Sequence, residues 1–138
     1  MNTIEETLKE YQRKSSVFVN VINSVDDETI WGIQDVNEDL WRHFNGEWLL
    51  IKPYLVDMDK TFDFIEPDIY IRLTKESKRI LSELLLKYPE SLNYFWHNIF
   101  FKDDYVFVKV IEGCESMYIS KTLNINNIQN SSDWVDFI

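Results

Sequence analysis

The sequence predicts an α+β fold in which an antiparallel sheet of hairpins packs against three to four helices. Helical and strand patterns follow one another in blocks, and no strand-helix-strand unit is repeated. The chain has the length of one domain, residues 1–138, and 45% of it is hydrophobic, which is enough to build a core. Its three glycines do not have the spacing of a phosphate-binding loop, so a doubly wound nucleotide-binding fold is not expected.

A helix is predicted to begin close to residue 3. Thr3 and Glu6 have the spacing of a capping box, which supplies partners for unpaired backbone N–H groups. Apolar residues then alternate by four and three positions as far as Val25, which indicates one long helix. Valines also alternate over residues 17–21, and β-branched residues favour strands, so a helix ending near Lys14 and followed by a strand is the competing interpretation. We favour the long helix.

Two short elements are predicted next. Asp35 to Phe44 has the apolar pattern of a short helix, and the pair Asn45-Gly46 should end it. Trp48 to Lys52 is predicted to be a strand that ends at Pro53.

A hairpin is predicted to follow, with strands over Thr61 to Ile65 and Ile69 to Leu73. Glu66-Pro67-Asp68 would form its turn, with proline in a favoured position. Five acids are expected to lie along one edge and the turn of this hairpin: Asp57, Asp59, Asp63, Glu66 and Asp68.

The second half of the chain predicts two helices and another hairpin. Thr74 is the expected N-cap of an amphipathic helix that cannot continue past Pro89. A further helix is predicted from Pro89 and carries apolar side chains as far as Phe100. Tyr105 to Ile111 and Met117 to Leu123 are expected to form an antiparallel hairpin.

The two ends of the chain carry no sign of export or membrane insertion. The first fourteen residues are polar and amphipathic, whereas a signal peptide needs a basic start and a continuous apolar run. No stretch approaches the roughly 18 apolar residues of a membrane span. With a single cysteine, these features predict a soluble cytoplasmic protein.

The last residues of the chain are predicted to form a loop and a docked end. Leu123 to Ser132 is predicted to be a loop, and Asp133 to Ile138 is expected to dock on the protein's own sheet rather than on a partner.

The negative charge is concentrated in one stretch. Between Asp26 and Asp68 there are twelve acidic and three basic residues, which accounts for nearly all of the formal net charge of −10. Such a field speeds encounter with a cationic partner and repels nucleic acid and anionic lipid. The expected partner is therefore a basic protein, and direct binding of nucleic acid or of a membrane is not expected.

Aromatic residues inside this stretch strengthen the prediction of a protein-binding surface. Trp48, Tyr54 and Phe62 lie among the acids, and an aromatic anchor surrounded by carboxylates is the composition of a hot spot for a basic protein. The residues predicted to contact the partner are Glu38, Asp39, Trp48, Tyr54, Asp57, Asp59, Asp63, Glu66 and Asp68.

No catalytic, cofactor or metal motif is found. Asp57 to Asp63 places oxygens at alternate positions as in a calcium loop, but lacks the turn glycine and the closing glutamate. His43 and His97 are the only histidines, which is too few for a zinc site of common spacing. Cys114 lies in a predicted turn with acidic neighbours, which would raise its pKa and reduce its reactivity. We therefore predict no enzyme activity, no cofactor and no metal.

In size, acidity and lack of catalytic motifs, the chain resembles the immunity proteins with which bacteria neutralise toxins, such as nucleases, delivered by neighbouring cells. The resemblance implies an inhibitor that binds a basic toxin domain at or beside its substrate site, with carboxylates steering the encounter. It rests on no diagnostic motif and assigns no individual residue. A DNA-mimicking inhibitor and a secretion chaperone share the acidity and stay open, as does a small enzyme with a deep pocket around His43 or His97.

Overall fold

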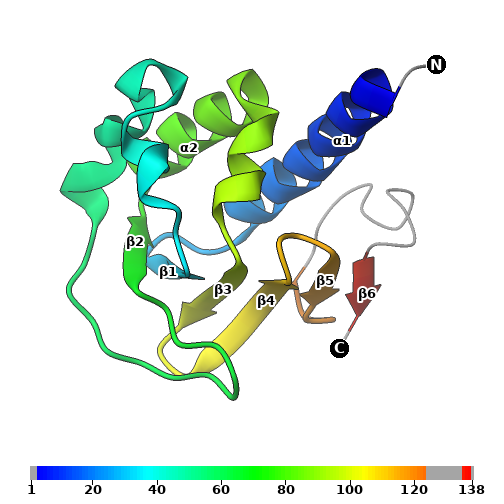
Figure 1. The fold of residues 1–138 in the computed structure, drawn as a ribbon. Coiled ribbons are helices and arrows are strands. Elements are labelled where there is room, and N and C mark those ends of the chain that lie inside the picture. Colours follow the sequence, from blue (N-terminus) through cyan, green and yellow to red (C-terminus); the bar gives the residue numbers. More distant parts are fainter. Residues whose placement is uncertain (1–2, 124–134, 138) are drawn as a thin grey trace.

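One sheet lies between a helical layer and a long loop in the computed structural model, which describes residues 3–123 and 135–137 (Figure 1). The helical layer holds α1 (Thr3–Ser24), α2 (Lys75–Lys87) and the 3-10 helices η1 (Glu38–Trp41), η2 (Phe44–Tyr54) and η3 (Pro89–Tyr94). The strands are β1 (Thr29–Gln34), β2 (Ile69–Leu73), β3 (His97–Lys102), β4 (Tyr105–Ile111), β5 (Ser116–Ile119) and β6 (Val135–Phe137).

The strand order is β2-β1-β3-β4-β5-β6 within the described residues. Each neighbouring pair from β2 to β5 is antiparallel, whereas β6 runs parallel to β5. The predicted α+β class is therefore confirmed, while the prediction of a purely antiparallel sheet is correct only in part. Val135–Phe137 docks on the protein's own sheet, as expected, and the predicted loop after Leu123 lies outside the described residues.

The long N-terminal helix is confirmed by α1. Val17, Phe18, Val21 and Ile22 are buried on one side of it, against the sheet and α2. The alternating valines are therefore helical, and the competing strand over residues 17–21 is wrong. Burial of an apolar helical face outweighs the modest preference of valine for strands.

The helix at residue 75 is also confirmed, together with its cap. The Thr74 side chain accepts a hydrogen bond from the Ser77 backbone N–H (3.2 Å), and the Ser77 hydroxyl accepts one from the Thr74 N–H (2.8 Å). This reciprocal pair fixes the start of α2, which ends before Pro89 as expected.

The helix predicted from Pro89 to Phe100 is wrong beyond Tyr94. η3 ends there, and β3 begins at His97 in the middle of the sheet. The side chains of residues 97–101 are all buried, because both faces of a central strand are covered. A short apolar run of this kind cannot be told from a buried helix by its periodicity.

The acidic half of the chain departs most from expectation. Residues 48–52 belong to η2 rather than to a strand, and the helix expected over residues 35–44 is reduced to η1. Residues 61–65 do not pair with β2, whose antiparallel neighbour is β1, with Ile71 opposite Trp31. The hairpin predicted around Glu66-Pro67-Asp68 is therefore wrong. The apolar residues of this segment instead cover the second face of the sheet.

Two clusters of buried side chains hold the layers together. The larger one fills the space between the helices and the sheet, and Trp31 lies in it without exposed surface. The smaller one contains Ile65, Tyr70, Ile99 and Phe101 and lies between the sheet and the loop. The loop is therefore packed on the fold.

Gly32 on β1 leaves the room that lets the loop approach the sheet. A Cβ at this position would lie 2.8 Å from Pro67 Cγ and 3.2 Å from Ile99 Cγ2. We expect Gly32→Val to push Pro67 away and to destabilise the protein by about 1–3 kcal/mol. Urea unfolding with hydrogen exchange of residues 56–68 tests this, with Gly32→Ala as a milder version. If Gly32→Val had the free energy of unfolding of the wild type and the same protection of residues 56–68 from hydrogen exchange, the predicted clash with Pro67 would be contradicted.

Candidate functional site

The acidic loop, defined as residues 56–68, crosses the face of the sheet opposite the helices (Figure 1). Its ends are fixed by backbone hydrogen bonds from the Val56 N–H to the Tyr70 carbonyl (2.8 Å) and from the Asp68 N–H to the Ile33 carbonyl (2.9 Å). Its middle is fixed by the Tyr70 hydroxyl, which accepts from the Lys60 N–H (2.8 Å). The loop is therefore ordered by the sheet beneath it.

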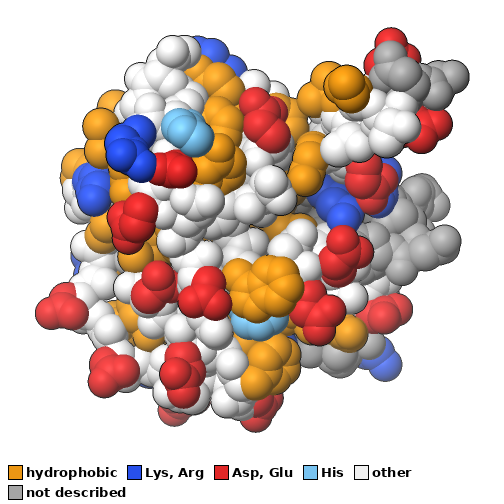
Figure 2. Space-filling model, viewed as in Figure 1, with side chains coloured by type: hydrophobic (Ala, Val, Ile, Leu, Met, Phe, Trp, Pro, Cys, Tyr) orange, Lys and Arg blue, Asp and Glu red, His pale blue; other side chains and the backbone are white. Residues whose placement is uncertain are grey.

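The structure brings together the five loop acids that the sequence predicted, on a loop rather than on a hairpin. All five are exposed: Asp57, Asp59, Asp63, Glu66 and Asp68. Lys109 Nζ lies 3.3 Å from Asp63, and within the described residues the other four have no basic side chain at ion-pair distance. Figure 2, which views the molecule from the side as in Figure 1, shows acidic side chains spread over its lower half, with hydrophobic side chains among them.

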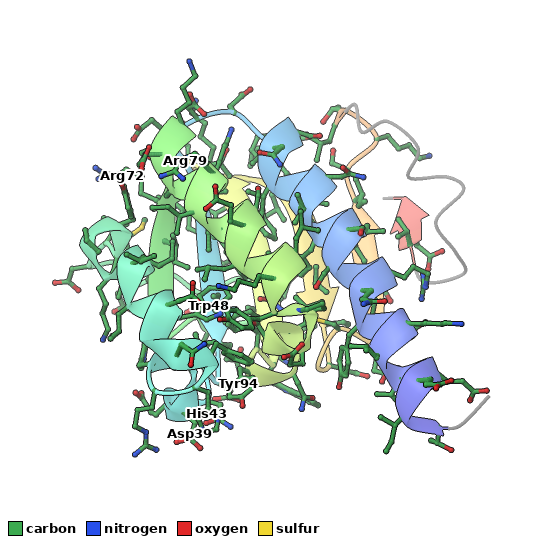
Figure 3. All side chains as sticks on the ribbon, turned by 90° about the horizontal axis from the view of Figure 1, so that it is seen from above. Asp39, His43, Trp48, Arg72, Arg79 and Tyr94 are labelled. Atoms are coloured by element: carbon green, nitrogen blue, oxygen red, sulfur yellow. The ribbon has the colours of Figure 1, made fainter. Side chains whose placement is uncertain are left out.

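Glu38 and Asp39 are not part of the acidic loop. They belong to η1, which packs against η2 and η3. Asp39 pairs with Arg42 and lies beside His43 in Figure 3. The predicted partner-binding acids therefore divide into a loop group and an η1 group, and we keep the loop group as the candidate site.

None of the three predicted aromatic anchors is an exposed side chain. Trp48 has no exposed surface, and its indole N–H donates to the Ser91 hydroxyl (3.0 Å), so its assignment to a partner-binding surface is wrong (Figure 3). Tyr54 is half-buried. Phe62 is half-buried too and packs on Phe101 with ring centroids 4.6 Å apart.

Two other aromatic rings are exposed, one on the acidic loop and one directly before β3. Phe64, 57% exposed, and Trp96, 45% exposed, lie on either side in contact with His97. The centroid of the His97 ring is 5.3 Å from that of Phe64 and 5.2 Å from that of Trp96. We call these three residues the ring cluster. Sequence reasoning missed it because Trp96 was placed within a helix and Phe64 within a strand.

Carboxylates lie on both sides of the ring cluster. The Trp96 N–H donates to the Gln34 carbonyl (3.2 Å), and this bond brings Asp35, the residue after Gln34, to one side of Trp96. The Trp96 carbonyl accepts from the Gly113 N–H (2.8 Å), which brings Glu112 to the other side. Both carboxylates act by their charge on His97 and favour its protonated form.

The neutral ring of His97 is held in one tautomer. The Glu112 backbone N–H donates to its Nδ1 (3.1 Å), so the proton of the neutral ring is on Nε2. Burial lowers the pKa of His97 below its usual 6.5, against the smaller opposing effect of Asp35 and Glu112. His97 is therefore neutral at pH 7.

This lowered pKa predicts a pH-dependent stability. As pH falls below about 7, the unfolded chain takes up the His97 proton before the folded one, so the free energy of unfolding declines until the folded pKa is passed. Urea unfolding of wild type and His97→Gln from pH 7.5 to 5 checks this. The difference in the free energy of unfolding between the two proteins is expected to narrow as the pH falls. A constant difference would rule out a contribution of His97 to the pH dependence. Carboxylates with a lowered pKa, such as Glu76, lose their contribution to the free energy of unfolding only below about pH 4.5.

The other chemically interesting groups have structural surroundings. His43 Nδ1 lies 2.6 Å from the Tyr94 hydroxyl, and the two rings are side by side in Figure 3. Cys114 is buried, and burial raises the pKa of its thiol to about 12, with only a smaller contribution from Glu115. The expected direction of that shift is correct, but burial rather than acidic neighbours is its main cause. Within the described residues, no group of three or more His, Cys, Asp or Glu side chains is arranged to hold a metal ion.

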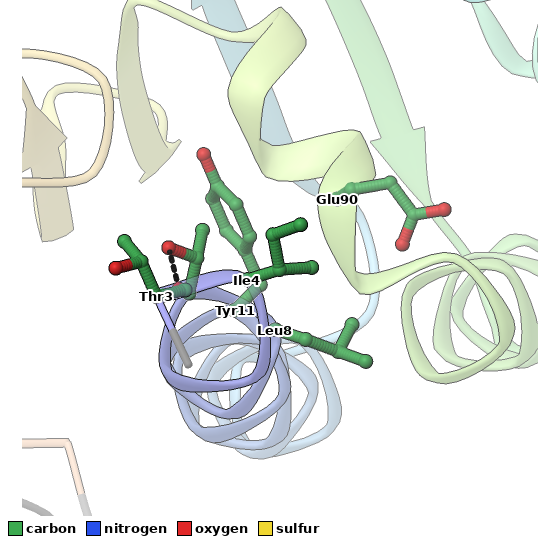
Figure 4. Close-up of a pocket in the computed structure, with 6 residues that line it drawn as sticks. Thr3, Ile4, Leu8, Tyr11 and Glu90 are labelled. Atoms are coloured by element: carbon green, nitrogen blue, oxygen red, sulfur yellow. Dashed lines mark hydrogen bonds between the residues drawn. The ribbon is translucent and has the colours of Figure 1, made fainter. Parts of the chain in front are cut away.

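Two hollows in the surface are further candidate sites. One, of about 360 Å³, lies at the start of α1 and is lined by Thr3, Ile4, Thr7, Leu8 and Tyr11, with Glu90 opposite (Figure 4). It offers no pair of groups for acid-base chemistry. The second, of about 240 Å³, adjoins the ring cluster and is lined by Phe64, Lys109, Ile111 and Tyr118. The second hollow extends the surface formed by the acidic loop and the ring cluster.

Comparison of the chain with protein-family models, curated proteins and solved structures finds no match. Among the described residues, no helix combines the length and the apolar character needed to cross a membrane. The geometry of the acidic loop and of the ring cluster is therefore the basis for a functional proposal.

Proposed function

We propose that this protein is an inhibitor that binds a basic protein partner through the acidic loop, in the manner of an immunity protein that neutralises a toxin. The observation that carries the proposal is the exposure of five carboxylates on a loop that is held against the sheet. A basic toxin domain, such as a nuclease that binds phosphate groups, presents the complementary charge. We place this inhibitor in the cytoplasm.

The order of the loop supports binding as well as encounter. Its backbone is hydrogen-bonded at both ends, and its own Ile65 side chain is fully buried against the sheet. A partner would therefore meet carboxylates that are already in position, and little conformational entropy would be lost on binding. Because four of the five carboxylates have no basic neighbour at ion-pair distance among the described residues, their field is directed at the solvent.

Affinity capture from the native host tests the proposal. The tagged protein is recovered at low and at physiological salt, and the proteins bound to it are identified by mass spectrometry. We expect a basic partner whose toxicity or nuclease activity is suppressed on binding, and whose capture weakens as salt rises. An unfolded effector segment would indicate a secretion chaperone instead, and the absence of a partner at both salt concentrations would contradict the proposal.

A further inference from the structure

The ring cluster presents exposed aromatic surface between carboxylates. The exposed rings are Phe64 and Trp96, and His97 packs between them at 7% exposure. Asp35 follows Gln34, whose carbonyl accepts from the Trp96 N–H. Glu112 precedes Gly113, whose N–H donates to the Trp96 carbonyl on the other side. Rings and carboxylates therefore belong to one surface, at the end of the sheet where β1 and β4 finish and β3 begins.

We propose that the ring cluster receives an arginine side chain of the basic partner, stacked on Trp96 and paired with Asp35 or Glu112. This inference rests on the proposed function and specifies which residue type the partner supplies. A guanidinium group is planar, so it can stack on an indole and donate two parallel hydrogen bonds to a carboxylate. The ammonium group of lysine has no planar surface to stack in this way.

The charges around the ring cluster favour a cation over an apolar side chain. An apolar group placed on Trp96 would take water away from Asp35 and Glu112 without replacing its hydrogen bonds, which is unfavourable. Lys109, the cation lining the adjacent hollow, is paired with Asp63 at 3.3 Å. The positions next to Asp35 and next to Glu112, and not the hollow beside Lys109, are therefore the ones that suit a guanidinium group.

His97 positions the exposed rings. Its Nδ1 is tied to the Glu112 backbone (3.1 Å), so the imidazole joins the turn after β4 to both rings. Gly113 packs on the Trp96 indole, since a Cβ there would lie 3.5 Å from Trp96 Cζ3. With these contacts beneath and beside it, the Trp96 ring is held with part of its surface open to a partner.

Three nine-residue peptides separate stacking from charge: nona-arginine, nona-lysine and the neutral nona-citrulline. Binding is measured by titration at fixed salt, with the indole N–H signal of Trp96 followed by NMR. We expect nona-arginine to bind about two- to fivefold more tightly than nona-lysine and to shift the Trp96 signal. Nona-citrulline is expected to bind least. In Trp96→Leu, the preference for arginine is expected to disappear while binding of nona-lysine is retained.

The outcomes distinguish this inference from the proposed function. Equal binding of nona-arginine and nona-lysine, or a preference that survives in Trp96→Leu, would overturn the arginine site and leave the acidic loop as a binding surface. Failure of both cationic peptides to bind would count against both proposals. The double variant Asp35→Asn and Glu112→Gln keeps the rings, and is expected to reduce the preference for arginine. Dispersed NMR spectra of each variant show that it is folded.

Discussion

Replacing Asp59, Glu66 and Asp68 with lysine is expected to slow association with the proposed basic partner by about tenfold or more. The three side chains are exposed and belong to the acidic loop, so the change reverses the field where the partner approaches. Asp63 is left in place because it pairs with Lys109 and has a φ of 52°, a backbone conformation that favours small polar residues over lysine. The association rate is measured by stopped-flow mixing at several salt concentrations.

The control for this variant carries the same net change of charge elsewhere. Glu6, Asp26 and Glu90 are also exposed and lie outside the loop, on α1, after α1 and on η3. Their replacement by lysine is expected to slow association much less, since charges beyond the Debye length of about 8 Å are screened at physiological salt. Equal rates for the two triple variants would show that net charge, and not the acidic loop, steers the partner.

Trp31→Ala is expected to lower the free energy of unfolding by about 3–5 kcal/mol. The Trp31 ring has no exposed surface, and its centroid lies 5.3 Å from that of Phe18 and 5.4 Å from that of Phe100. Its removal leaves a cavity and also leaves the buried Asn98 Oδ1 without the indole N–H that donates to it (3.0 Å). Since small domains are stable by only about 5–15 kcal/mol, much of the stability would be lost.

Trp96→Ala is the matched control, because it removes the same side chain from a position that is 45% exposed. We expect a loss of about 1 kcal/mol or less, since most of the cost of such a change comes from burial. Urea unfolding of both variants, followed by circular dichroism, measures the difference. Similar losses would mean that Trp96 is as important to the fold as Trp31, and would make it unsuitable as a probe of binding.

The fold could be predicted from the sequence where the signals are local. The 4,3 alternation of α1, the cap of α2 and the hairpin of β4 and β5 each depend on residues close in the chain, and each is confirmed. The second strand of the hairpin ends at Ile119, however, and not at Leu123 as predicted. β3 was missed because a central strand with both faces buried has the same apolar composition as a buried helix. The partner of β2 was missed because β1 and β2 are neighbours in the sheet but far apart in the chain.

The candidate site divides in the same way. The exposure of the loop acids follows from their own chemistry, since an unpaired carboxylate is costly to bury. Which aromatic rings are exposed depends on the packing of the whole chain. The Trp48 indole donates to Ser91 on η3, whereas Phe64 and Trp96 both contact His97 only because β3 begins beside the acidic loop. No pattern within either segment carries that information.

The connection from β1 to β2 has a consequence for how this protein can evolve. It joins two strands that are adjacent in the sheet, and it carries nine of the acidic residues. Because both of its ends are anchored in paired strands, substitutions at its solvent-facing positions leave the sheet and helices unchanged. The surface can therefore diverge while the scaffold is preserved, which is what the proposed inhibitor would need if its target changes over generations.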